Sequence, residues 1–155
     1  MPTVLDTTTL ADFARRLHAL REDTPPRWGR MDAPAMLRHL RAALAMSLGE
    51  LDVPLLVPTW IGAPIGWLFT RVLTRWPRSL GGRNPPVLAL HPPPSEASFD
   101  EERERVLAQL RRFVERLDAD PRERALHPVF GNLTLERWTR VHALHLAHHL
   151  RQFGA

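Results

Sequence analysis

The clearest periodic pattern in the chain lies near its end, between Thr134 and Phe153. Apolar residues recur there at alternating spacings of three and four, which predicts one amphipathic helix. Histidine and glutamine stand in part of the row that would face the core, where an ordinary core helix carries Leu, Ile or Ala. The predicted row consists of Leu135, Trp138, His142, His145, His149 and Gln152.

Three further segments show apolar stripes with the helical period. The first is Thr7–Arg21, where a threonine can serve as the N-cap. The second begins at the N-cap Asp32 and runs to about Leu48, before a glycine at the C′ position. The third opens with the capping-box pair Ser98 and Glu101. We therefore predict an all-α fold, a four-helix bundle forming a single domain over residues 1–155, with a Pro/Trp-rich insertion between the second and third helices.

His39, on the second predicted helix, adjoins an apolar stripe beside small or flexible residues that leave room around its imidazole. His145 and His149 are one turn apart on the last predicted helix, a spacing at which two imidazoles can converge on one cation. Three neutral imidazoles would leave a coordination position open for water or substrate, as catalytic metal sites do. On the residues alone, such a metal site and a cluster of hydrogen-bonded core histidines both stay open.

Two other histidines of the last helix require separate interpretations. His142 lies one turn before His145 on the same face, so it could support a ligand or act as a general base. His148 points about 100° away from His149, and we expect it to contact another helix or solvent.

The segment Val53–Trp76 is the main apolar feature outside the predicted bundle helices. Its first 18 residues carry no charge, but three prolines interrupt them and two arginines follow at once. Tryptophans beside arginines would also suit a helix lying at a membrane interface. We favour an insertion whose Trp and Leu residues cover one end of the bundle or a partner, and we do not expect membrane contact.

Composition excludes several classes of chemistry. The chain has no cysteine, so it offers no disulfide, thiolate ligand or cysteine nucleophile. All 21 basic residues are arginine, which excludes a Schiff-base or P-loop lysine. The arginines alternate with acidic residues along the chain, so the net charge of +4 does not predict specific nucleic-acid binding. The N-terminal residues lack the pattern of a signal peptide, and we expect a cytoplasmic protein.

The motif from His145 to His149 also restricts the classes of reaction that the protein could catalyse. The metalloprotease motif H-E-x-x-H has a glutamate after its first histidine, and Leu146 stands at that position here. The general base for peptide hydrolysis is therefore missing. The chain has no G-x-S-x-G sequence and no prominent carboxylate pair, so a serine hydrolase or a glycosidase is not indicated.

Two blocks of residues resemble the DinB-like superfamily of bacterial metalloenzymes. The C-terminal block is His127–Thr134 (HPVFGNLT), then Trp138, then His145–Gly154 (HLAHHLRQFG). The N-terminal block is Trp28–Met31 followed by Met36–Leu40. The chain looks closest to a branch ending in the pattern HPxFGxLT…HxxHHLxQFG.

The resemblance implies an up-up-down-down four-helix bundle that is often dimeric. It also implies a divalent metal, which we expect to be Zn or Ni, on a triad that maps to His39, His145 and His149. Characterised relatives are S-transferases and isomerases that use low-molecular-weight bacterial thiols. A metal makes a bound thiol nucleophilic at neutral pH. The leading hypothesis is therefore a metal-dependent thiol S-transferase acting on a small molecule, as a homodimer. A non-catalytic dimerisation or interaction module and a metal-dependent hydrolase are the alternatives.

Overall fold

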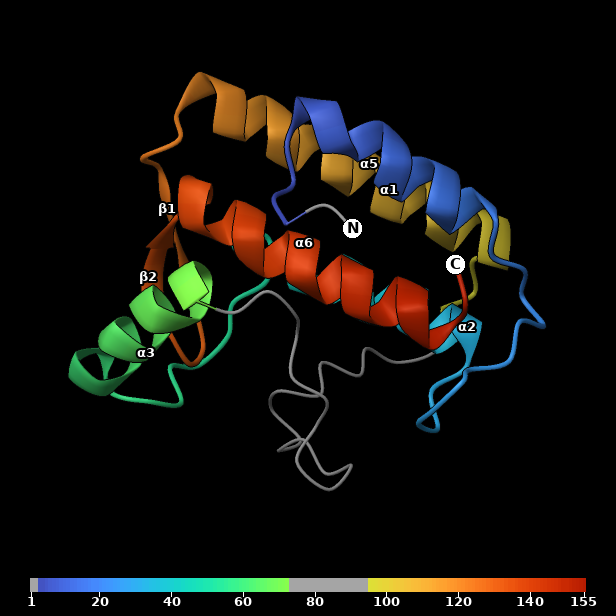
Figure 1. The fold of residues 1–155 in the computed structure, drawn as a ribbon, viewed down its shortest axis with the longest axis horizontal. Coiled ribbons are helices and arrows are strands. Elements are labelled where there is room, and N and C mark those ends of the chain that lie inside the picture. Colours follow the sequence, from blue (N-terminus) through green and yellow to red (C-terminus); the bar gives the residue numbers. More distant parts are fainter. Residues whose placement is uncertain (1–2, 73–94) are drawn as a thin grey trace.

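A computed structural model describes residues 3–72 and 95–155, and these residues are mostly helical (Figure 1). The glycine and proline pairs after Trp76 predict a turn-rich segment as far as Ser98, and its residues up to position 94, His91 included, fall outside the described residues. The described elements, in chain order, are α1 (Thr7–His18), α2 (Ala33–Ser47), α3 (Thr59–Val72), α5 (Phe99–Ala119), β1 (Arg124–His127), β2 (Gly131–Thr134) and α6 (Leu135–Gln152).

Most of the sequence signals for helix ends are confirmed. Asp32 caps α2 by accepting a hydrogen bond from the Ala35 amide, and Ser98 and Glu101 form the capping box of α5. Gly49 follows α2 with a φ of 69°, as a C′ glycine does. The predicted start of α1 at Thr7 is confirmed, but its cap residue and its end were wrong. Asp6 is its N-cap, and the helix stops at His18.

The predicted apolar stripes form one core between α1, α2, α5 and α6. The row predicted on α6, polar members included, is buried along its whole length from Leu135 to Gln152. The most deeply buried large side chains of the other three helices are Phe13, Leu17, Met36, Leu37, Leu40, Leu44, Leu107, Leu110 and Phe113. The core therefore closes over the histidine-bearing face of α6.

Polar contacts fix the direction of α2 against α5. The Arg41 guanidinium, in the middle of α2, donates to the carboxylate of Glu102, near the start of α5, at 2.9 Å. Near their ends, Arg116 donates to the Leu48 carbonyl at 2.7 Å. The two helices therefore run parallel, which requires the long connection that the sequence places between them.

The remaining two helices run in the opposite direction. Thr7 at the start of α1 donates to Asp118 near the end of α5. His142 in the first half of α6 lies beside Ser47 at the end of α2. The order is therefore up-down-down-up, and the predicted up-up-down-down order is wrong. Residues 19–32 reverse the direction of the chain between α1 and α2. The long crossover connection instead lies between α2 and α5.

A two-stranded hairpin precedes α6 and corrects the prediction of an all-α fold. Strands β1 and β2 are antiparallel, pairing Arg124 with Thr134 and His127 with Gly131. Each has only four residues, too few for a period-two pattern to stand out from a loop. The hairpin leads directly into α6, whose N-cap is Thr134, the residue at which the predicted helical segment begins.

The helix α3 packs on the turn of this hairpin through its smallest residues (Figure 1). A Cβ on Gly62 would lie 2.0 Å from the Val129 carbonyl oxygen, and one on Gly66 would lie 2.7 Å from the Phe130 Cβ. The large residues face outward instead, with Trp60 79% exposed and Trp67 45% exposed. These two exposed tryptophans do not cover one end of the bundle, the alternative that they cover a partner stays a prediction, and Trp76 is not among the residues described. Within the described ranges, no helix has both the length and the apolar character needed to cross a bilayer.

Candidate metal centre

The three predicted ligands come together in the core. His39 reaches inward from α2, and His145 and His149 reach inward from successive turns of the antiparallel helix α6. All three are buried, with exposed fractions of 7–8%. One nitrogen from each ring lies within 4.8 Å of the others, so the group could hold a metal ion.

The Nε2 atoms of the three rings face one another at short range. The His145 Nε2 lies 2.9 Å from the His39 Nε2 and 3.0 Å from the His149 Nε2. A ring nitrogen carries either one proton or one lone pair in the ring plane. The central nitrogen can therefore make only one of these two contacts as a linear hydrogen bond. Hydrogen bonding within the group satisfies the three atoms only in part.

The electrostatics of the group keep two of its rings neutral. Burial, with smaller contributions from the neighbouring His39 and His148, lowers the pKa of His149 to about 3. Burial also lowers the pKa of His145 well below its usual value, with the nearby histidines adding to the effect. Both rings are therefore neutral at neutral pH, each with one N–H and one bare nitrogen whose lone pair could bind a cation.

The spacing of the nitrogens fits a metal site. Imidazole nitrogens about 2.0–2.1 Å from a shared Zn lie about 3–3.4 Å from one another. The two Nε2 separations in this group are at or just below that range. The third separation in the group, between His39 and His149, is within 4.8 Å.

Gln152 supports the group from one turn beyond His149. Its Oε1 lies 2.8 Å from the His149 Nδ1, and its Nε2 donates to the Trp28 carbonyl at 2.8 Å. Trp28 belongs to the connection between α1 and α2. The sequence places Gln152 in the buried row, but its partner lies in a loop that periodicity does not place, so this contact was missed.

His142 is held away from the three facing nitrogens. Its Nε2 lies 2.7 Å from the Ser47 Oγ, and the Ser47 hydroxyl donates to the Leu44 carbonyl. The ring stacks on Trp138 with centroids 5.0 Å apart and has Phe113 at its edge. Burial lowers the pKa of His142 to about 3, which makes it a weak proton acceptor. Of its two predicted roles, this favours support of the neighbouring turn over general base catalysis.

Two further histidines have structural contacts. The His148 ring meets the edge of Trp28 at a centroid distance of 5.9 Å, and this partner lies in the connection between α1 and α2, not in another helix as we expected. His127 lies in the hairpin, where its Nδ1 accepts from the Val129 and Phe130 amides. Its ring stacks on Phe130 at 4.3 Å, and burial lowers its pKa to about 4. His127 therefore holds the turn on which α3 packs.

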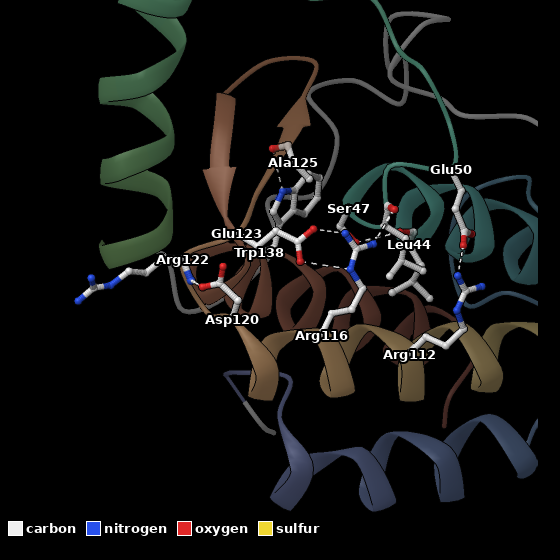
Figure 2. A network of polar contacts seen from close by, with 11 residues as sticks. Leu44, Ser47, Glu50, Arg112, Arg116, Asp120, Arg122, Glu123, Ala125 and Trp138 are labelled. Atoms are coloured by element: carbon white, nitrogen blue, oxygen red, sulfur yellow. Dashed lines mark hydrogen bonds and ion pairs between the residues drawn. The ribbon is translucent and has the colours of Figure 1, made fainter.

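A polar network fixes the end of α2 relative to its neighbours (Figure 2). Arg116 of α5 donates both to the Leu48 carbonyl and to the Glu123 carboxylate. The Trp138 indole of α6 donates to the Ala125 carbonyl of β1 at 3.2 Å. These contacts tie the end of α2 to α5 and the start of α6 to the hairpin.

A family model described as "Protein of unknown function (DUF1569)" matches residues 2–155. The chain belongs to the DUF1569 family. No curated protein and no solved structure matches it. The function of this DUF1569 chain must therefore be argued from its own residues, and the buried three-histidine group is the feature that carries that argument.

Proposed function

We propose that this DUF1569 chain is a metal-dependent enzyme whose ligands are His39, His145 and His149. The observation that carries the proposal is the convergence of three buried Nε2 atoms, separated by 2.9 and 3.0 Å along the group. Two of the rings are held neutral by their surroundings. Histidines that serve only as core residues would gain more from separate hydrogen-bond partners, as His142 does with Ser47.

We further propose that the helices form a DinB-like four-helix bundle. The resemblance in the two sequence blocks supports this, and so does the position of the triad between the second helix and the last. The up-down-down-up order replaces the order that we expected from the resemblance. In this bundle, α2 supplies one ligand and α6 supplies two.

The metal that we propose is Zn or Ni, since neutral imidazoles suit both. A divalent metal at such a site lowers the pKa of a thiol or of water that approaches it. The chain has no cysteine, so a reacting thiol would come from a low-molecular-weight cofactor. We propose transfer of that thiol to a small electrophile, in which a sulfur–carbon bond forms, the bond from that carbon to its leaving group breaks, and the thiol proton ends on the departing group. Hydrolysis by an activated water is the weaker alternative.

Elemental analysis of the purified protein tests the site directly. We expect about one metal per chain in the wild type, from three-histidine coordination, and its loss in His39→Ala and His145→Ala. The matched control is His18→Ala on α1, where the imidazole is half exposed and contacts Glu104. Stoichiometric metal in the triad variants would contradict the ligand assignment. An apoprotein that takes up neither Zn nor Ni would contradict metal binding altogether.

An activity screen then separates the two reactions. We expect the metal-loaded protein to consume electrophiles only when a small thiol is added. Turnover without any thiol would favour the hydrolase. The His39→Ala protein serves as the background in both assays.

The outward face of α3 supports a second candidate, an interaction module that self-associates. Trp60 is 79% exposed and Leu68 is 54% exposed, while the inner face of the helix carries small residues. A surface helix normally turns its large apolar residues to the core. We propose that these residues meet a second copy of the chain, which would make the protein a homodimer.

Sedimentation tests this candidate independently of metal. Trp60→Arg is expected to convert a dimer to a monomer, because a charge would be buried at the interface. Val4→Arg, at an apolar residue 36% exposed outside α3, is the matched control and is expected to leave the dimer intact. A wild-type protein that sediments as a monomer would refute self-association.

A further inference from the structure

We propose that Gln152 is a positioning residue, which fixes the tautomer of His149 and thereby directs its bare Nε2 at the other two histidines. The effect on metal affinity rests on the proposed function. The tautomer itself does not, because it follows from contacts made by the protein alone.

The orientation of the Gln152 amide is set by its partner in the loop. The Trp28 carbonyl oxygen can only accept hydrogen bonds, so the side-chain atom 2.8 Å from it is the amide nitrogen of Gln152. The amide oxygen must then face the opposite way. It lies 2.8 Å from the His149 Nδ1.

The amide oxygen in turn decides which nitrogen of His149 carries the proton. An amide oxygen has no hydrogen to donate, so the hydrogen bond requires a proton on Nδ1. In a neutral imidazole the other nitrogen is then bare. The bare Nε2 faces the His145 Nε2 at 3.0 Å. Without Gln152, either nitrogen could carry the proton, and a proton on Nε2 would block that lone pair.

The loop is shaped to hold Gln152 in this orientation. Gly29 has a φ of 82°, which side-chain-bearing residues rarely adopt, and a Cβ there would lie 2.8 Å from the Gln152 Nε2. The Arg27 amide donates to the main-chain carbonyl of Gln152 at 2.7 Å. The loop therefore contacts both the side chain and the backbone of Gln152. The connection between α1 and α2 thus takes part in ordering the site, although it supplies no ligand.

The first test is the tautomer in metal-free protein. Correlation spectra of ¹⁵N-labelled imidazoles at pH 7.5 distinguish a protonated ring nitrogen from a bare one, and His149→Ala assigns the signals. We expect protonated Nδ1 and bare Nε2 in the wild type, and a mixture or the opposite tautomer in Gln152→Leu. Gln152→Glu retains an acceptor for Nδ1 and is expected to keep the wild-type tautomer.

The second test is the affinity for Zn, measured by competition with a chelator. Loss of such an orienting partner typically weakens metal binding by about 10–100-fold. We expect this loss in Gln152→Leu and a smaller one in Gln152→Glu. The matched control is Gln109→Leu on α5, which removes an amide that contacts Glu50 and no histidine. Gly29→Ala is a second route to the same effect, because it displaces the Gln152 amide without removing it.

The outcomes separate this inference from the proposed function. A wild-type His149 protonated on Nε2, or a Gln152→Leu protein with an unchanged tautomer, would overturn the positioning role. If the wild type shows the expected tautomer but takes up no metal, the positioning role stands and the metal-dependent function fails. If Gln152→Leu does not fold, as judged by circular dichroism, Gln152→Glu and Gly29→Ala decide between these outcomes.

Discussion

The buried histidines predict that the metal-free protein loses stability on mild acidification. Burial lowers the pKa of His127 to about 4 and those of His142 and His149 to about 3. In the unfolded chain each pKa returns to about 6.5. The folded values lie below the unfolded ones, so between these limits the unfolded state binds more protons. Stability is therefore complete above pH 6.5 and falls as the pH decreases towards 3–4.

The magnitude follows from these pKa values. At pH 5, a histidine with a folded pKa of about 3–4 lowers the free energy of unfolding by about 2 kcal/mol relative to pH 7.5. The three groups together remove about 6 kcal/mol, and His145 acts in the same direction. A domain of this size has about 5–15 kcal/mol in total. We expect the protein to be close to its unfolding threshold at pH 5.

Urea titrations at pH 7.5, 6 and 5, with a chelator present, measure this loss through tryptophan fluorescence. For each protein we compare the free energy of unfolding at pH 7.5 with that at pH 5. The difference between the two values cancels any effect of the substitution that does not depend on pH. In His142→Leu this loss should be smaller by about 2 kcal/mol, since one buried histidine is gone. In His18→Ala it should equal that of the wild type. A wild-type free energy that is constant within about 1 kcal/mol over this pH range would refute the reasoning.

Two further substitutions test the contacts that place the helices. Gly62→Ala puts a Cβ 2.0 Å from a backbone oxygen of the hairpin turn and should lower the free energy of unfolding by about 1–3 kcal/mol. Its control is Gly49→Ala, which has open space around it and should lose only about 1 kcal/mol through the strain of its φ of 69°. Arg116→Met removes the hydrogen bond to the Leu48 carbonyl and should cost about 1–3 kcal/mol in urea titrations, while the exposed Arg111→Met should change stability by less than about 0.5 kcal/mol.

The predictable part of the fold is the part that rests on local chemistry. Apolar periodicity located the four long helices, and cap residues such as Asp32 and Ser98 located several of their ends. The cap of α1 was missed because threonines follow Asp6 directly, and any of these residues can accept from the first turn. Helix direction is a property of the whole chain. The parallel run of α2 and α5 shows only in contacts such as Arg41 with Glu102.

The same division applies to α3 and to the hairpin. The sequence shows an apolar segment with Gly62 and Gly66 spaced one turn apart, but it does not show which face packs inward. Space decides that question, because the hairpin turn approaches too closely for any side chain larger than hydrogen at these two positions. Large apolar residues are therefore left outside, against the usual preference. A rule based on hydrophobicity alone selects the wrong face.

The candidate site was predictable where the geometry of one helix was sufficient. Residues four apart share a face, which places His145 beside His149 in any helical fold. His39 is 106 positions from His145 in the chain, and only tertiary packing brings their Nε2 atoms to 2.9 Å. The Trp28 carbonyl is less predictable still, because backbone atoms of a loop leave no signal in the side-chain pattern.

The buried histidines finally divide into two kinds by what their nitrogens contact. The His127 Nδ1 accepts two backbone hydrogen bonds, and the His142 Nε2 pairs with a serine hydroxyl. In the group formed by His39, His145 and His149, the Nε2 atoms instead face one another. Placing lone pairs together away from water is costly unless a cation or a shared proton offsets it. The depressed pKa values of His145 and His149 oppose an added proton, so only the N–H of a neutral tautomer or a cation can offset this cost. A single N–H on the central His145 Nε2 can serve only one of its two contacts.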